Sequence, residues 1–223
     1  MELKKIAEEL LPRSMAARDW VFQVIRSAII RGALPGNMPL KQDEISAALN
    51  VSHIPVREAF RQLESQGLVR IYPNRGAVVT KLSQKEMGNV MDARIMLELG
   101  ALRAAIPFIS PGDIDKAREF LDRFAERQDY YNSYRLNLSL HSALYAPCDN
   151  AFLLTLIEQM HANVDRYLYP YFDGGGSAQL YSVEEHGQLI DACESHDAEL
   201  ATALLRTHLE STKQLLLSSS LLD

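Results

Sequence analysis

The sequence predicts a mainly α-helical protein: an N-terminal winged helix-turn-helix of three helices and a two-stranded wing, then an all-helical antiparallel bundle. Three observations predict this fold class. Amphipathic helical patterns separated by short turns run along most of the chain, a β-rich stretch occurs only at residues 68–80, and the charge balance reverses near residue 81. With 223 residues the chain is long enough for two small domains, which we expect over residues 1–81 and 82–223.

The charge and the apolar runs narrow the function classes. Residues 1–81 contain 12 Lys+Arg and 8 Asp+Glu, whereas residues 82–223 contain 11 and 21. Only the domain of residues 1–81, called the front module below, would therefore be attracted to a polyanion such as DNA; residues 82–223 are called the back module. No run approaches the ~20 apolar residues of a membrane span, and the acidic N-terminus lacks a signal core. Two distant cysteines without CxxC spacing are typical of reduced thiols, so we expect a cytoplasmic protein that is not membrane-bound.

Three helices and a hairpin can be placed in the front module. Helical periodicity predicts helices over residues 16–31, 42–49 and 53–66, and the segment ALPGNMPL between the first two predicts a turn. The segments LVRIY and AVVT, separated by PNRG, predict a hairpin with a four-residue loop. In a winged helix-turn-helix the second helix of the pair enters the major groove, and Arg75 and Gly76 at the hairpin tip would touch the minor groove or the phosphate backbone.

The predicted helix over residues 53–66 contains the side chains best suited to contact DNA. Ser52 is a good N-cap, and the N–H groups of the first turn favour a phosphate. Arg57 and Arg61 are four residues apart and share one face, from which arginine can bind guanine or phosphate. The alternative for Arg57 is a salt bridge with Glu58 or Glu64 on a solvated surface.

A family resemblance covers about residues 17–80. The segment VSHIPVREAFRQLESQGLVRIYPNRGAVV resembles the GntR family of bacterial transcription factors, whose signature is roughly VSRTPVREALRRLEAEGLV followed by a PNRGxxV wing. Helix, stop and wing match in order. The resemblance implies that Ser52, Arg57, Arg75 and Gly76 contact DNA.

The front module departs from that pattern at three positions. His53 and Ile54 stand where the family usually has Arg and Thr, and Asp43 stands where many relatives have Arg. A neutral histidine can still form a hydrogen bond with a base, so His53 remains a candidate DNA contact. We therefore expect an operator that differs from the commonest pattern of the family.

The back module contains histidines at positions that helical geometry brings together. Asn137 and His141 are four residues apart on one helix. His186 and His208 lie at similar distances from a turn near residue 196, so two antiparallel helices would place them level with each other. Three imidazoles converging in a helical bundle can form a divalent metal site. The alternative is that each histidine is an isolated surface or core residue.

The back module has a family resemblance of its own, over about residues 85–215. The segments MDARIMLELGALRAAI, LHSALY, NAFLL and EEHGQLIDACESHDAELATALLRTHL resemble the FCD ligand-binding domain of the FadR-type branch of the GntR family. In its metal-binding members an Asp and three His hold the ion. The resemblance places the histidines at His141, His186 and His208, and it implies Zn, Ni or Mn as the metal. Asn137 stands at the Asp position, and an amide oxygen is a poorer ligand for a transition metal than a carboxylate.

An effector pocket is implied by the same resemblance. A metal with open positions suits a small organic acid, and Arg94 resembles the pocket arginine of the family. The alternative for Arg94 is a buried pair with Glu98, four residues further on. Arg166 and Tyr167, on a later helix, could also face the cavity. The side chains expected to fill the core are Met91, Met96 and Met160.

Together these patterns predict a two-domain transcriptional regulator, a repressor as most relatives are. It would bind a double-stranded DNA operator as a homodimer, because a two-fold site mirrors a two-fold protein. Two other classes stay open. A three-histidine site with an open position could instead belong to a metal-dependent hydrolase, and the winged helix could instead bind another protein.

Overall fold

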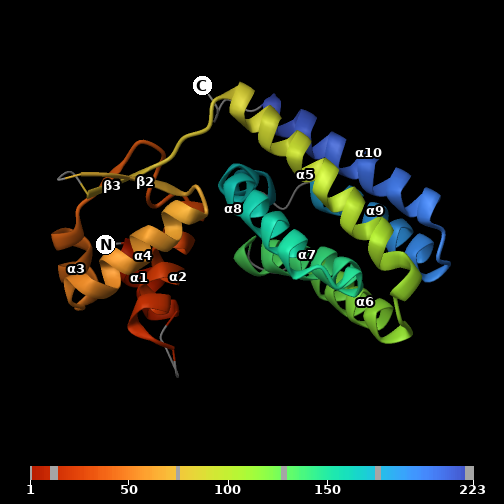
Figure 1. Ribbon diagram of the computed structural model, residues 1–223, viewed down its shortest axis with the longest axis horizontal. Helices are drawn as coiled ribbons and strands as arrows, with labels where there is room; N and C mark the ends of the chain where they lie inside the picture. The colour runs from red at the N-terminus through yellow and green to blue at the C-terminus, as the bar shows by residue number, and fades with distance from the viewer. Residues whose placement is uncertain (1, 11–14, 74–75, 127–129, 174–176, 219–223) are drawn as a thin grey trace. The chain divides into compact units, whose positions relative to one another are not determined.

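The computed structural model divides the chain into two compact units, Met1–Ser83 (unit 1) and Gln84–Asp223 (unit 2). The division falls two residues beyond the expected boundary at residue 81. The mainly helical fold class predicted from the sequence is confirmed (Figure 1). The residues that the structure describes are 2–10, 15–73, 76–126, 130–173 and 177–218.

Unit 1 contains a helix that the sequence analysis did not expect. The predicted helices correspond to α2 (Ala17–Ile30), α3 (Gln42–Leu49) and α4 (His53–Ser65). They are preceded by α1 (Glu2–Glu9), which packs on α2 and buries Ile6 and Ala7. This helix has only eight residues, most of them charged, and is shorter than the window of about 11–18 residues over which helical periodicity is recognised in a sequence.

The wing is a three-stranded antiparallel sheet. Its strands are β1 (Pro39–Leu40), β2 (Val69–Tyr72) and β3 (Gly76–Val79), in the order β1-β3-β2. The sequence prediction of a turn was wrong at the last two residues of ALPGNMPL, which form β1. Proline is tolerated there because β1 is an edge strand and pairs on one side only.

Gly76 is required by the backbone of the wing. The sequence predicts that Gly76 lies in the hairpin loop, but it begins β3 and pairs with Tyr72. Its φ is +78°, which favours glycine, and a Cβ at this position would lie 2.7 Å from the carbonyl oxygen of Leu40. Gly76 therefore allows β1 to approach β3.

The described part of unit 2 contains six α-helices, about the number expected from the sequence. Figure 1 shows α5 and α10 side by side along their length, and α6 packs against α7 and α9. Local signals fix several helix starts; at α6, for example, Ser110 and Asp113 form a capping box. The helices are α5 (Gln84–Ala105), α6 (Pro111–Ala125), α7 (Tyr130–Tyr145), α8 (Ala151–Asp173), α9 (Ser177–Glu194) and α10 (Ala198–Leu217).

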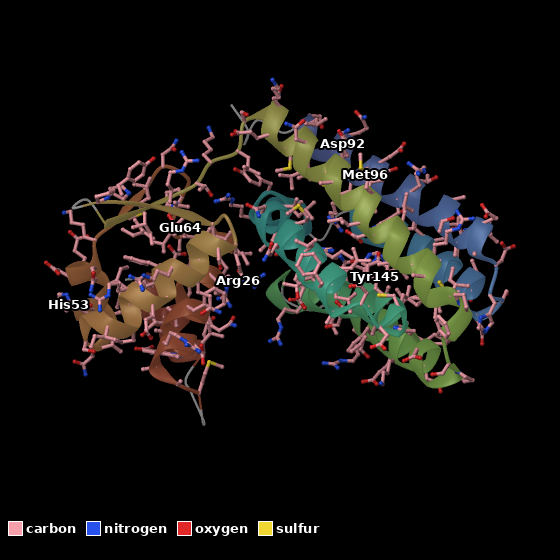
Figure 2. All side chains as sticks on the ribbon, in the orientation of Figure 1. Arg26, His53, Glu64, Asp92, Met96 and Tyr145 are labelled. Carbon is pink, nitrogen blue, oxygen red and sulfur yellow. The ribbon has the colours of Figure 1, made fainter. Side chains whose placement is uncertain are left out.

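The core of unit 2 is mainly apolar, and it also buries polar side chains that include the cluster described below. Met91 is fully buried, as expected, but the prediction for Met96 was wrong, since its side chain is 73% exposed (Figure 2). At 100° per residue Met96 is turned well away from the buried face that holds Met91, Ile95 and Leu102. Among the described residues, no helix is long and apolar enough to cross a membrane.

We expect Gly76→Ala to destabilise unit 1. The substitution adds strain at positive φ and a clash with Leu40, so it should cost at least about 1 kcal/mol of unfolding free energy. Urea unfolding followed by the fluorescence of Trp20, the single tryptophan, reports on this unit.

Gly32→Ala is the matched control, because Gly32 has φ +75° but a Cβ added there would meet no atom within 4 Å. It should cost less than Gly76→Ala, since it adds strain without the clash. Equal losses would contradict the role of the β1 contact.

Candidate nucleic-acid interface and metal centre

The start of α4 presents polar groups outward. Ser52 occupies the N-cap position with extended backbone angles, but its side chain makes no capping hydrogen bond, so that part of the prediction was wrong. The exposed hydroxyl and the first-turn N–H groups can instead meet a phosphate. The turn before α4 is closed by Asn50, whose left-handed backbone ends α3.

The two faces of α4 are clearly separated. Val56, Phe60 and Leu63 are buried, whereas Arg57 and Arg61 are exposed. Within the described part of the chain neither arginine forms an ion pair, so the proposed pairing of Arg57 with a glutamate is not seen. Both guanidinium groups are therefore available to a nucleic acid.

The two polar departures from the family signature contact each other. His53 is exposed, and its Nδ1 lies 3.4 Å from Asp43 Oδ1 (His53 is labelled in Figure 2). Gln42 Nε2 also donates to the carbonyl oxygen of His53 at 2.8 Å. These contacts tie the start of α3 to the start of α4. Arg75 lies outside the described residues.

Three histidines from three helices converge in unit 2. His141 comes from α7, His186 from α9 and His208 from α10, and one ring nitrogen of each lies within 4.8 Å of the others. The Nε2 atoms of His141 and His186 are 3.0 Å apart. His141 and His186 are buried, and His208 is partly buried. The convergence expected from helical spacing is thus present.

A buried chain of hydrogen bonds orients His141. Tyr145 donates its hydroxyl proton to Glu98 Oε2 at 2.7 Å, and His141 Nδ1 lies 3.1 Å from the same hydroxyl (Tyr145 is labelled in Figure 2). Burial, followed by the charge of Glu98, raises the pKa of Tyr145 well above its usual value, so the hydroxyl keeps its proton. Burial lowers the pKa of His141 well below its usual value, so the ring is neutral. Nδ1–H then donates to Tyr145, and Nε2 offers a lone pair.

A carboxylate orients His208 in a similar way. His208 Nδ1 lies 2.6 Å from Glu185 Oε2. This hydrogen bond holds the pKa of Glu185 below its usual value, so Glu185 is an acceptor and Nδ1 of His208 carries the proton. The nitrogen left for a metal is Nε2, as in His141.

Asn137 supplies an oxygen with unmet hydrogen-bonding capacity. Its Oδ1 is buried and accepts no hydrogen bond from any described residue. A buried acceptor without a partner costs about 1–3 kcal/mol, which a metal ion or another donor would offset. Asn137 precedes His141 by one turn of α7. The three converging imidazole nitrogens fit a divalent transition metal, and the one-turn spacing makes the Asn137 oxygen a candidate fourth ligand.

Arg94 forms the buried pair with Glu98 that was considered as one of its two roles. Its Nε donates to Glu98 within a fully buried pair, whereas its buried Nη1 has no hydrogen-bond partner in the described part of the chain. His161 Nε2 also lies 3.1 Å from Glu98. Burial would raise the pKa of Glu98, but Arg94 and His161 outweigh it and hold the pKa well below the usual value.

Arg166, on α8, contacts the ring of its neighbour Tyr167. Burial lowers its pKa, and its guanidinium lies 5.2 Å from the ring centre of Tyr167. This contact is local to α8 and does not by itself bring Arg166 to the histidines.

Sequence reasoning missed three members of the site. Tyr145 follows His141 by four residues, so helical spacing alone could have found it. Glu185 and His161 act across helices, at 2.6 Å from His208 and 3.1 Å from Glu98, and no spacing along one helix predicts such contacts.

Comparison with known proteins assigns both units. Residues 17–79 match the bacterial regulatory proteins of the gntR family, and residues 89–211 match the FCD domain. The chain belongs to the GntR family. Its FCD domain contains the three histidines, and its GntR helix-turn-helix contains α4. The protein is a DNA-binding transcriptional regulator and not an enzyme, and the hydrolase alternative finds no support.

Relatives cover nearly the whole chain. The HTH-type transcriptional repressor RspR of Escherichia coli K12 is 28% identical over 210 residues, which are 93% of this chain and 92% of RspR. A crystal structure of a GntR family member from Pseudomonas syringae pv. tomato is 31% identical, with a TM-score of 0.53 and coverage of 96% and 91%. The structure of E. coli McbR/YncC is 22% identical with a TM-score of 0.79 over 91% and 97% of the two chains, a likeness that shows the fold.

The stability of this GntR regulator should depend on the charge of Glu98. Its folded-state pKa lies well below the usual 4.5, so between these two values only the unfolded chain binds the proton. Its contribution is complete above about pH 4.5 and is lost as the pH falls toward the folded-state pKa. The difference in unfolding free energy between the wild type and Glu98→Gln, measured by urea and circular dichroism from neutral pH downward, should shrink in this window.

Glu199→Gln serves as the control, because Glu199 is an exposed carboxylate of the same unit, paired with Arg103. It should follow the wild-type profile. A wild-type advantage over Glu98→Gln that stays constant with pH would show that Glu98 is not held ionised.

Proposed function

We propose that this GntR regulator is a cytoplasmic, homodimeric repressor that binds an operator through α4 and the wing, and that it senses a small organic acid at a divalent metal in the FCD domain. The observation that carries the sensing function is the convergence of three histidine nitrogens within 4.8 Å from α7, α9 and α10. The name of RspR, a transcriptional repressor, supports repression.

Exposed arginines support the DNA-binding role of α4. Arg57 and Arg61 lie on the face opposite Val56 and Phe60, so they can reach a groove while the helix stays packed. Ser52, His53 and the first-turn N–H groups would contact the phosphate backbone or nearby bases, as would Arg75 and Gly76 in the wing.

The FCD residues support recognition of an organic acid. Nε2 of His141, His186 and His208, with Asn137 Oδ1, would hold Zn, Ni or Mn, which supplies a Lewis-acid centre for a carboxylate. The N–H group on Arg94 Nη1 has no partner among the described residues and would bind a second oxygen of the acid. Arg166 is a further candidate for the same pocket.

A dimer connects sensing to DNA binding. Two copies of α4 would occupy the half-sites of a palindromic operator. The organic acid can change operator affinity only if it binds more tightly to one arrangement of the two copies than to the other.

Arg57→Ala should weaken operator binding about 10–100-fold, because one bidentate contact is worth about 1–3 kcal/mol. A duplex selected from a random pool by the wild-type protein can serve as the probe. If the lost contact is to phosphate, the slope of log K against log salt should fall by about one.

Arg103→Ala removes an exposed arginine from unit 2 and should leave the affinity unchanged. An Arg57→Ala protein that binds as tightly as Arg103→Ala would sink the assignment of α4 as the recognition helix.

His141→Ala and His208→Ala should each lower the metal content of protein purified without chelator or tag. Because three nitrogens converge on one point, the wild type should contain about one equivalent of metal per chain, measured by inductively coupled plasma mass spectrometry. Removing one ligand should lower occupancy and leave the fold intact.

His53→Ala, which removes an exposed histidine from unit 1, is the control and should keep the wild-type content. Full occupancy in both FCD variants would exclude the proposed site.

A further inference from the structure

The proposed metal centre has no negative charge among its inner ligands. The three imidazoles are neutral when they ligate, and the side chain of Asn137 is an uncharged amide. A divalent cation in partly buried surroundings then needs compensation from groups further out, because the interior solvates charge poorly.

Two carboxylates are connected to the histidines by hydrogen bonds, one directly and one through a tyrosine hydroxyl. Glu185, on α9, is 2.6 Å from His208 Nδ1. Glu98, on α5, reaches His141 through the hydroxyl of Tyr145, with distances of 2.7 and 3.1 Å. A carboxylate that accepts the outer N–H of a ligating histidine fixes the ring and makes its other nitrogen a stronger donor.

The two carboxylates differ in the cations that surround them. Glu98 is fully buried and already pairs with the guanidinium of Arg94, so its charge is matched inside the bundle. Glu185 forms an ion contact with His208 and none with a lysine or arginine among the described residues. Its negative charge therefore remains available to the metal centre.

We propose that Glu185 is a positioning residue that compensates for the amide at position 137. It holds His208 with Nε2 toward the ion and supplies, through the imidazole, the negative charge that a carboxylate ligand would otherwise give. This inference rests on the proposed metal site, and it assigns to Glu185 a role that the ligand set alone does not contain.

Substitutions at Glu185 separate charge from orientation. Glu185→Gln removes the charge but keeps an oxygen acceptor for His208 Nδ1–H, whereas Glu185→Ala removes both. Zn²⁺ affinity, measured by competition with a chromophoric chelator, should fall about 10-fold in Glu185→Gln and up to about 100-fold in Glu185→Ala. Glu185→Asp keeps a carboxylate and should therefore lose less Zn²⁺ affinity than Glu185→Ala. The absorption spectrum of the Co²⁺-loaded protein should shift in Glu185→Ala, which a loss of packing alone would not cause.

Glu184→Gln is the matched control, because Glu184 is the exposed neighbour of Glu185 on α9 and its substitution makes the same change in net charge. It should keep the wild-type Zn²⁺ affinity and Co²⁺ spectrum. Equal affinities in Glu185→Gln and Glu184→Gln would overturn the inference.

A double-mutant cycle tests the link to Asn137. Asn137→Asp places a carboxylate among the inner ligands, so Glu185→Gln should cost several-fold less Zn²⁺ affinity in that background than in the wild type. An equal cost in both backgrounds would contradict compensation.

The outcomes also separate this inference from the proposed function. A wild type that binds no Zn²⁺ would overturn both the proposed metal site and the role of Glu185. A wild type that binds Zn²⁺, with His141→Ala defective but Glu185→Gln unaffected, would uphold the site and overturn the role of Glu185 alone.

Discussion

The buried carboxylate of Glu98 is the interaction on which the FCD domain depends. It is fully buried and contacts Arg94 on its own helix, Tyr145 on α7 and His161 on α8. These partners hold α5, α7 and α8 in a fixed relation. Through Tyr145 the same carboxylate sets the tautomer of His141, so a structural ion pair also orients a ring of the proposed metal site. Losing Arg94 would leave the buried carboxylate without its guanidinium partner, which costs about 3–5 kcal/mol.

In the helix-turn-helix unit, backbone conformation at two residues positions the wing and α4. Gly76 lets β1 approach β3, and the left-handed residue Asn50 ends α3 so that α4 can begin after a short turn. The apolar side of α4 is then buried, and Arg57 and Arg61 face outward. Packing thus determines which residues of α4 face outward, and under the proposed function side chains such as His53 would help to select the bases that are contacted.

Much of the helical fold and of the histidine cluster could be predicted from the sequence, because long helices show a strong periodic pattern of apolar residues. The helices of the FCD domain and the convergence of His141, His186 and His208 both follow from 3.6-residue spacing and antiparallel order. The two-residue strand β1 leaves no such signal. The partners of the site were harder still, because the contact of Glu185 with His208 depends on the register between two helices, which spacing along either one does not contain.

The most direct test of the account is a diffraction experiment on the metal-soaked GntR regulator, with data collected on both sides of the absorption edge of zinc. We predict one anomalous peak per chain in the FCD domain, about 2.0–2.1 Å from Nε2 of His141, His186 and His208. Glu185 should still accept the Nδ1–H of His208. No peak at this position, or a zinc ion bound through Nδ1 of His208, would contradict the account.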